Sequence, residues 1–349
     1  MSEQSVLLYD RFGRIVRRRR LCLAGLALAL LCSLCLDLMA GPADLGLSDI
    51  VSGLFRPDEM DMRHRIILWD VRLPDALIAL AVGGCLGLAG IESQTILDNP
   101  LASPFTLGVS SAAVFGASVA IVSAPALAFL PIGVAVPGMA LVFALGSGGL
   151  ILMVVRISGG ARETVVLFGI ALVFLWTATT SGLHMVADVD AIQEIVFWSI
   201  GNLTKAGWNE VAIVFAVFTL VLPFSLRQVW VMTLLRGGEA QARSMGIDIS
   251  RLRVWVIFRT SVLAAFAVCF VGTISFVGLV GPHVARLIFG EDHRALVPGA
   301  ALCSALILSL ASFLSKTLIP GVVIPVGVLT AVVGVPVLLS LLAGRRRPR

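Results

Sequence analysis

The sequence has 349 residues, of which 58% are hydrophobic and 13% are charged, and its mean hydropathy is +1.00. Soluble domains carry about 25% charged residues, so this composition excludes a soluble protein and predicts a polytopic membrane protein. The net charge of +5 comes largely from arginines beside apolar runs. That distribution is typical of orientation in a membrane, and it argues against nucleic-acid binding.

Long apolar runs predict an all-α protein, because backbone polar groups in lipid must be satisfied within each segment. We expect about ten transmembrane helices, or eight if residues 254–289 and another pair of runs are assigned wrongly. The expected spans are residues 21–40, 74–96, 105–122, a fourth ending at 155, 164–183, 211–226, two within 254–289, 296–314 and 325–343. A short interfacial helix is expected between residues 185 and 210.

Both termini are predicted to be cytoplasmic, because most of the 26 basic residues fall on one side of the expected alternation of spans. Residues 1–20 and 344–349 are basic tails in this interpretation, and residues 21–343 form a single transmembrane domain. A basic start before an apolar run also fits a signal peptide cleaved after Ala40. The many later spans favour an uncleaved first helix.

The sequence contains no pattern typical of a catalytic or metal site. Its four histidines, at positions 64, 184, 283 and 293, form no pair at helical metal spacing, and its six cysteines lie in apolar runs. A phosphate-binding loop needs a glycine-rich turn ending in Lys-Ser/Thr, and neither Lys205 nor Lys316 has that context. We therefore expect no enzyme activity, metal or cofactor in this chain, so any ATP and magnesium would be bound by a partner.

One acidic residue lies deep in an apolar run. Glu92, with Gln94 beside it, is inside the span expected at 74–96, and Arg259 is inside the seventh span. Ionisable groups within a membrane are functional hypotheses by default. Glu92 therefore supports an alternative function, an ion-coupled secondary transporter, and a membrane scaffold is a third and more distant hypothesis.

The most informative stretch runs from Arg72 to Gly108. Its apolar runs are separated by Asp98-Asn99-Pro100-Leu101-Ala102-Ser103-Pro104. Each proline lacks an N–H and restricts the residue before it, so neither a helix nor a strand continues through this segment. We expect a helical hairpin that lines a translocation path.

This stretch, with Gly90, Gln94, Asn99-Pro100-Leu101-Ala102, Pro104 and Gly108, resembles the permease subunits of ABC importers for ferric siderophores, haem and vitamin B12. Three further stretches match that family in the same order. They are Phe197 to Asn202, Gly272 to Arg286 followed by Gly290 to Arg294, and Ile324 to Pro336. The resemblance covers about residues 65–343.

The resemblance implies a permease subunit in the bacterial inner membrane, surrounded by lipid, with spans 2–5 and 7–10 as inverted repeats. It would dimerise with a second copy or a paralogue around a path for an iron chelate, most simply a ferric siderophore, with haem or vitamin B12 as the other substrates. Two ATPase subunits would bind from the cytoplasm. A periplasmic or lipid-anchored substrate-binding protein would bind from outside.

By matching position, the resemblance places Asn99, Pro100 and Leu101 at a cytoplasmic gate, although these residues could simply cap and pack a turn. Residues 227–253 match a coupling loop for the ATPase, within which Glu239 and Ala240 begin a short helix that ends at Gly246. A solvated loop is the alternative interpretation there.

Two further sets of residues receive roles from the resemblance. Pro282, His283 and Arg286 mark the cytoplasmic end of span 8. Arg72 and Lys316 match basic residues that dock the binding protein, although Asp75, Ser312 and Val323 depart from the family pattern.

Overall fold

The computed structural model describes residues 3–41, 43, 45–126 and 129–344. Within these residues the regular structure is helical, apart from one isolated β-bridge between Ile319 and Val322. The elements are α1 (Glu3–Met39), α2 (Leu47–Phe55), η1 (Pro57–Glu59), α3 (Met62–Ile66), η2 (Ile67–Arg72), α4 (Leu73–Ile96), α5 (Val109–Val122), α6 (Ile132–Ile157), α7 (Arg162–His184), α8 (Val189–Ser199), α9 (Trp208–Arg227), α10 (Val229–Leu235), α11 (Glu239–Ser244), α12 (Ile249–Val271), α13 (Val277–Phe289), α14 (His293–Thr317) and α15 (Val326–Gly344).

The described residues contain seven helices that are long and apolar enough to cross a membrane, together with the three shorter apolar helices α5, α13 and α15. These ten helices agree with the expected number of spans. Residues 254–289 do form two helices, since the chain breaks between Val271 and Val277, and the expected interfacial helix is α8.

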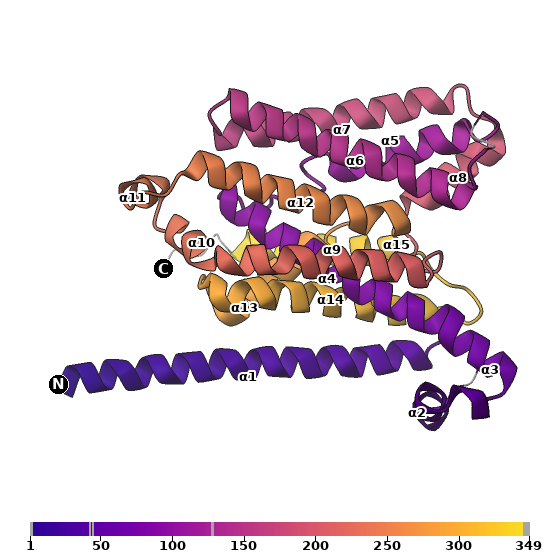
Figure 1. Cartoon of the computed structure of the whole chain (residues 1–349), viewed down its shortest axis with the longest axis horizontal. Coiled ribbons are helices and arrows are strands. Elements are labelled where there is room, and N and C mark those ends of the chain that lie inside the picture. The colour runs from indigo at the N-terminus through magenta and orange to yellow at the C-terminus, as the bar shows by residue number, and fades with distance from the viewer. Residues whose placement is uncertain (1–2, 42, 44, 127–128, 345–349) are drawn as a thin grey trace.

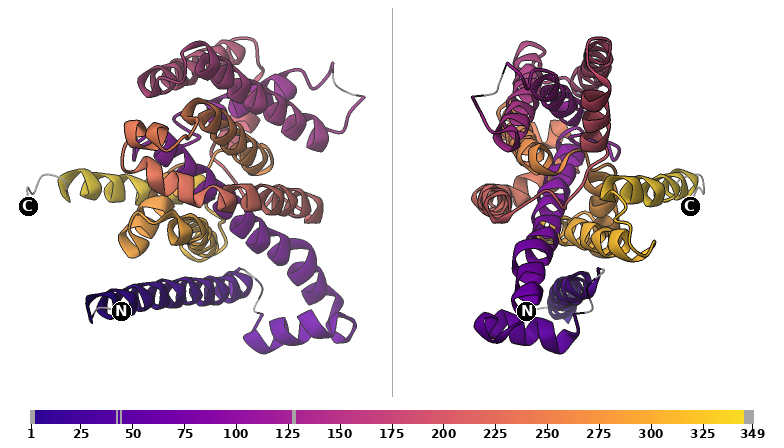
Figure 2. Two further views of the ribbon diagram at one scale, coloured as in Figure 1. Left: turned by 60° about the vertical axis from the view of Figure 1, so that its left-hand side comes forward. Right: turned by 90° about the vertical axis from the view of Figure 1, so that its right-hand side faces the viewer.

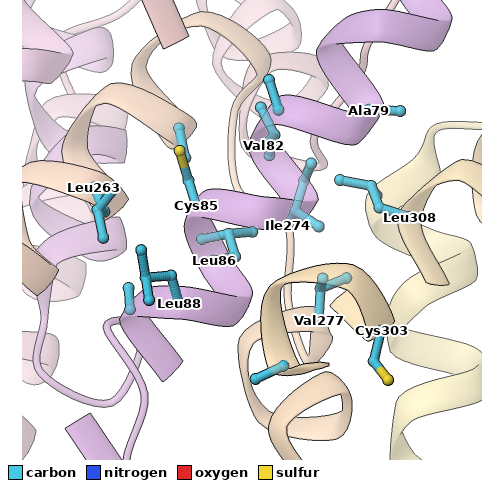
Figure 3. Packing of buried hydrophobic residues seen from close by; sticks show 14 of the residues in the cluster. Ala79, Val82, Cys85, Leu86, Leu88, Leu263, Ile274, Val277, Cys303 and Leu308 are labelled. Carbon is cyan, nitrogen blue, oxygen red and sulfur yellow. The ribbon is translucent and has the colours of Figure 1, made fainter. Parts of the chain in front are cut away.

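Helix α4 is the centre of the bundle. All of its 24 residues except Leu77 and Leu80 are buried, and it packs against α9, α12, α13 and α14. Figure 1 shows it crossing the molecule between a group formed by α5 to α8 and a group formed by α13 and α14. Figure 3 shows Val82, Leu86 and Leu88 of α4 among buried side chains of the neighbouring helices.

Glycines on α4 let its neighbours approach the backbone closely. A Cβ atom on Gly83 would lie 2.6 Å from the Cα atom of Ala305 on α14, and one on Gly90 would overlap the carbonyl oxygen of Gly278 on α13. Small residues at helix interfaces allow close backbone packing in membranes, where dispersion contacts hold helices together. The family-like glycine at position 90 is therefore explained by helix packing.

Two halves of the chain share a pattern of helix lengths. In the first half the 24-residue α4 precedes the 14-residue α5, and in the second the 23-residue α12 precedes the 13-residue α13. Both short helices begin after a residue in the left-handed region, Gly108 (φ 79°) and Phe276 (φ 65°). Short helices at corresponding positions are typical of inverted-repeat transporters, so the lengths support the expected repeat of spans 2–5 and 7–10.

The two regions that precede α4 differ from expectation. Residues 3–20, expected to be a basic tail, are helical and continue the first span as one 37-residue helix, and Arg19 pairs with Asp292 at the start of α14. The expected polar loop at residues 41–71 holds α2, η1, α3 and η2. Residues 345–349, the rest of the expected C-terminal tail, lie outside the described residues.

The helix bundle has two ends, and Figures 1 and 2 show it from three directions. One end carries α10, α11 and the charged segments near them, and we call it the arginine-rich end. The opposite end carries α2, α3 and α8. Helix α15 lies at the edge of the bundle, in contact with α13 and α14.

We predict that Gly90→Ala destabilises the protein, because the new methyl group would collide with backbone that cannot move alone. Overpacking a well-packed core costs about 1–3 kcal/mol or more. The matched control is Gly146→Ala on α6, where a Cβ would meet nothing within 4 Å. Thermal unfolding in detergent should show a lower midpoint for Gly90→Ala alone. Equal midpoints for the two variants would contradict the packing argument.

Candidate functional site

The segment between α4 and α5 forms a tight turn at the arginine-rich end. Asp98 adopts a left-handed conformation (φ 46°), and the backbone N–H of Asn99 donates to the carbonyl of Gln94 at 3.1 Å. The side-chain oxygen of Asn99 accepts a hydrogen bond from the N–H of Leu101 at 3.0 Å. The turn therefore fixes Leu101, whose side chain is 41% exposed, at the molecular surface. Asn99 does cap this turn, and a gate role stays a prediction.

The expected coupling loop contains the short helix α11. Its six residues are bounded by Gly238 and Gly246, whose φ angles of 105° and 82° favour glycine. Ala242 is fully buried, so one face of α11 is held against the bundle. The short helix predicted here is present, and it ends at Ser244, two residues before the predicted end at Gly246.

An ionic cluster joins α11 to the turn after α4. We define it by three acids and three arginines: Asp98, Glu239, Glu291, Arg162, Arg236 and Arg253. Arg162, the first residue of α7, is its centre. Its Nε donates to Glu239 Oε1 at 2.7 Å, and its Nη1 donates to Asp98 Oδ2 at 2.7 Å. A single guanidinium thus bridges the predicted coupling segment and the predicted gate segment.

Glu239 is held by further basic groups. Arg253 on α12, almost wholly buried, donates to Glu239 Oε1 at 2.6 Å, and Arg243 lies 3.3 Å from its other oxygen. Partial burial acts to raise the pKa of Glu239, but the hydrogen bonds from Arg162 and Arg253 outweigh it and lower the pKa. Glu239 is therefore ionised at neutral pH, and its favourable interactions weaken only as the pH falls through that lowered pKa.

The cluster also reaches α13 and α14. Arg236 lies 3.0 Å from Asp98 and 3.2 Å from Glu291, and Arg286 lies 3.7 Å from the same glutamate. Arg286 also donates to the side chain of Gln94 on α4 at 3.3 Å. Arg286 therefore contacts α4 directly and is linked to Asp98 through Glu291 and Arg236.

The other two residues named at that end, Pro282 and His283, lie within α13. Pro282 is buried, and its ring would lie 3.1 Å from a Cβ on Gly90, whereas His283 is partly buried. Pro282 is therefore part of the close packing of α4 on α13.

Glu92 has a specific partner inside the bundle. Arg259 Nη2 on α12 donates to Glu92 Oε1 at 2.8 Å, and Arg259 Nε donates to Oε2 at 3.3 Å. The same guanidinium donates to Gln228 between α9 and α10 at 3.0 Å. Both charged side chains are buried, at 7% and 2% exposure. The pair ties three parts of the bundle together and occupies the carboxylate that a proton or cation relay would need.

The two residues expected to dock a binding protein are turned inward. Arg72 is 4% exposed and donates to the carbonyls of Leu38 and Met39, near the end of α1, at 2.7 and 3.2 Å. Lys316 Nζ lies 3.0 Å from the carboxylate of Asp37, which also accepts from Ser312. The expectation that both offer their charges at the surface is therefore corrected. A cation beside the C-terminal carbonyls of a helix is stabilised there, and a buried lysine needs an acid partner.

Sequence reasoning missed Arg162, Arg253 and the pairing of Glu92 with Arg259. A signal existed for that pair, because the sequence places one glutamate and one arginine at depth in two different spans. No comparable signal identified Arg162 as a bridge, since its partners lie 64 and 77 residues away. Among the residues that the structure describes, no group of three or more His, Cys, Asp or Glu side chains could hold a metal ion.

Ten apolar helices, a repeated long-short helix pattern and an ionic cluster at one end define a multi-span transport permease. The chain belongs to the FecCD transport family, whose model matches residues 27–344. It is 36% identical over 283 residues to the Fe(3+) dicitrate transport system permease FecD of Escherichia coli, covering 81% of this chain and 87% of FecD. It is 31% identical over 342 residues to the vitamin B12 import system permease BtuC of Citrobacter koseri, covering 95% and 96% of the two chains.

The fold agrees with this family. A metal-chelate type ABC transporter solved in an inward-facing conformation superposes with a TM-score of 0.81 at 29% identity, covering 93% of this chain and 99% of that chain. The protein is therefore a permease of the ABC importer family that handles iron chelates, haem or vitamin B12.

We predict that the pair formed by Glu92 and Arg259 stabilises the bundle only as a pair. Arg259→Met leaves a buried carboxylate unpaired, and such changes cost about 3–5 kcal/mol. The double variant Glu92→Leu/Arg259→Met removes both charges and should recover most of that loss. A double-mutant cycle of thermal unfolding in detergent measures the coupling. Additive effects of the two single changes would contradict a direct pair.

Proposed function

We propose that this permease translocates an iron chelate, most simply a ferric siderophore, into the cytoplasm, driven by ATP hydrolysis on two partner subunits that bind ATP and magnesium. Haem and vitamin B12 are the alternative substrates. One observation carries the proposal: Arg162 contacts both α11 and the turn after α4, with two hydrogen bonds of 2.7 Å. A push on α11 would reach the turn through a single side chain.

In this proposal the arginine-rich end faces the cytoplasm. Positively charged segments are retained on that side of a bacterial inner membrane, so both termini would be cytoplasmic. Each ATPase would receive α11 in a cleft, and closure of the ATPases would displace the helix as a rigid body. Asn99, Pro100 and Leu101 would then form the gate, with Leu101 exposed toward the path.

A second permease copy or a paralogue would complete the path. The outer faces of α7 and α15 expose large apolar side chains, among them Phe174 at 70% and Val332 at 64% exposure. A translocation path whose walls carry so few charges would suit a bulky chelate, because the chelate must be released and not held tightly. The substrate-binding protein would dock at the opposite end, where Arg63 and Lys205 are exposed, in place of the inward-turned Arg72 and Lys316.

We predict that Arg162→Met uncouples ATP hydrolysis from transport, because it removes both arms of the bridge. Uptake per ATP hydrolysed should fall about tenfold, within the usual range for coupling between sites. Arg243→Met is the matched control, since Arg243 contacts Glu239 from an exposed position and does not reach Asp98. The measurement is uptake and ATPase activity in the same proteoliposomes. Copurification of the ATPase should persist, and an unchanged uptake ratio in Arg162→Met would argue against the bridge.

We predict that uptake of a ferric siderophore by reconstituted permease, ATPase and binding protein requires ATP and stops with vanadate. An ion-coupled carrier would instead continue without ATP, follow the proton or sodium gradient, and lose activity in Glu92→Gln. That second set of results would reject the ATP-driven mechanism. Competition with haem and vitamin B12 in the same assay assigns the substrate.

A further inference from the structure

Helices α6 and α12 pack against each other and leave a slot beside one of their closest contacts. A Cβ on Gly148 of α6 would lie 2.6 Å from the Cβ of Ser261 on α12, so the helices are in close contact there. Toward the arginine-rich end a cavity of about 490 Å³ opens between them, lined by Leu152, Arg156, Arg251, Val254, Trp255 and Phe258.

Two arginines, Arg156 and Arg251, line the opening of this slot, and neither forms an ion pair with an acidic residue that the structure describes. Arg156 and Arg251 are both exposed, and among the described residues no carboxylate lies within ion-pair distance of either. Arg251 lies in the first turn of α12, where the helix dipole disfavours a cation. The N-cap carboxylate of Asp248 accepts a hydrogen bond from the backbone N–H of Arg251 at 2.9 Å but forms no ion pair with its guanidinium, which is therefore available to an external anion.

The slot is apolar beyond the two arginines. Arg251, Trp255 and Phe258 follow one face of α12 at helical spacing, which extends about 10 Å along the helix at 1.5 Å per residue. The rings of Trp255 and Phe258 lie edge to face with centroids 6.1 Å apart. Tryptophan near the end of a transmembrane helix, as Trp255 is, is typical of the boundary between headgroups and acyl chains.

A second groove lies on the other side of Arg156. This cavity, also about 490 Å³, is lined by Gly149, Leu152, Met153, Arg156 and Ile157. A Cβ on Gly149 would meet nothing within 4 Å, so the floor of this groove is open. Leu152 and Arg156 line both grooves. The two grooves are therefore adjacent and share the guanidinium of Arg156.

We propose that these paired grooves bind one anionic two-chain phospholipid from the leaflet at the arginine-rich end. Its phosphate lies between Arg156 and Arg251, whose planar guanidinium groups suit phosphate oxygens. One acyl chain follows Trp255 and Phe258, and the other follows Gly149 and Met153. Basic pockets between transmembrane helices bind acidic lipid headgroups in this way, and the apolar walls favour a lipid over an acidic protein segment.

The test measures lipid retention by the purified full-length permease. Native mass spectrometry compares binding of phosphatidylglycerol and phosphatidylcholine to the unmodified protein and to Arg156→Gln/Arg251→Gln. Retention of phosphatidylglycerol should fall about thirtyfold in the double variant, as expected for the loss of two basic contacts near a membrane. The control Arg17→Gln/Arg18→Gln removes the same charge from exposed positions of α1 and should retain the lipid.

A second variant tests the acyl-chain grooves without changing any charge. Gly149→Leu fills the open floor and should also reduce retention of phosphatidylglycerol, while the headgroup analogue glycerol phosphate should not compete. Equal retention in Arg156→Gln/Arg251→Gln, equal loss in the α1 control, or displacement by glycerol phosphate would each overturn the proposal. Copurification of an acidic protein, released by the same double variant in place of lipid, would also overturn it.

Discussion

The close packing of α4 against α13 and α14 is the constraint on which the rest of the structure depends. At Gly83 and Gly90 the backbone of α4 lies directly against the backbones of α14 and α13. Helix α4 therefore cannot rotate or shift without breaking contacts on several sides. In a membrane, helices gain little from the hydrophobic effect between them, and dispersion contacts at such short range replace it. A helix fixed this firmly places the turn that follows it, and hence Asp98, with respect to the other segments at the arginine-rich end.

Charged groups inside the bundle then select which helices meet. Arg259 reaches Glu92 on α4 and Gln228 before α10, while Lys316 reaches Asp37 on α1. The side chains of each pair are almost fully buried, so separating the partners would leave an unpaired buried charge, which has a high free-energy cost. These pairs therefore specify neighbours that apolar packing alone does not distinguish, since one apolar helix face packs much like another.

At the arginine-rich end the charged groups are less buried and are shared among several segments. Arg162, at the first turn of α7, is rigidly placed by its helix and divides its donors between Glu239 and Asp98. The cluster is partly exposed, so its ion pairs can rearrange at lower cost than the buried pair formed by Glu92 and Arg259. A rigid bundle with a rearrangeable ionic cluster at one end is the arrangement that the proposed coupling of a partner's motion to a gate requires.

The sequence alone predicted the all-helical class, about ten spans, the break after α4, a short helix within residues 227–253 and the resemblance to the family. These follow from local properties: the length of apolar runs, proline and glycine positions, and the order of four motifs. The tertiary structure decided which charges pair, because Arg162, Arg259 and Lys316 find partners far away in the chain. It also turned Arg72 inward and extended α1 through the basic residues. Since apolar residues lie on every face of α4, no single apolar stripe in its sequence indicates which neighbour each side meets, and only the packed bundle resolves that choice.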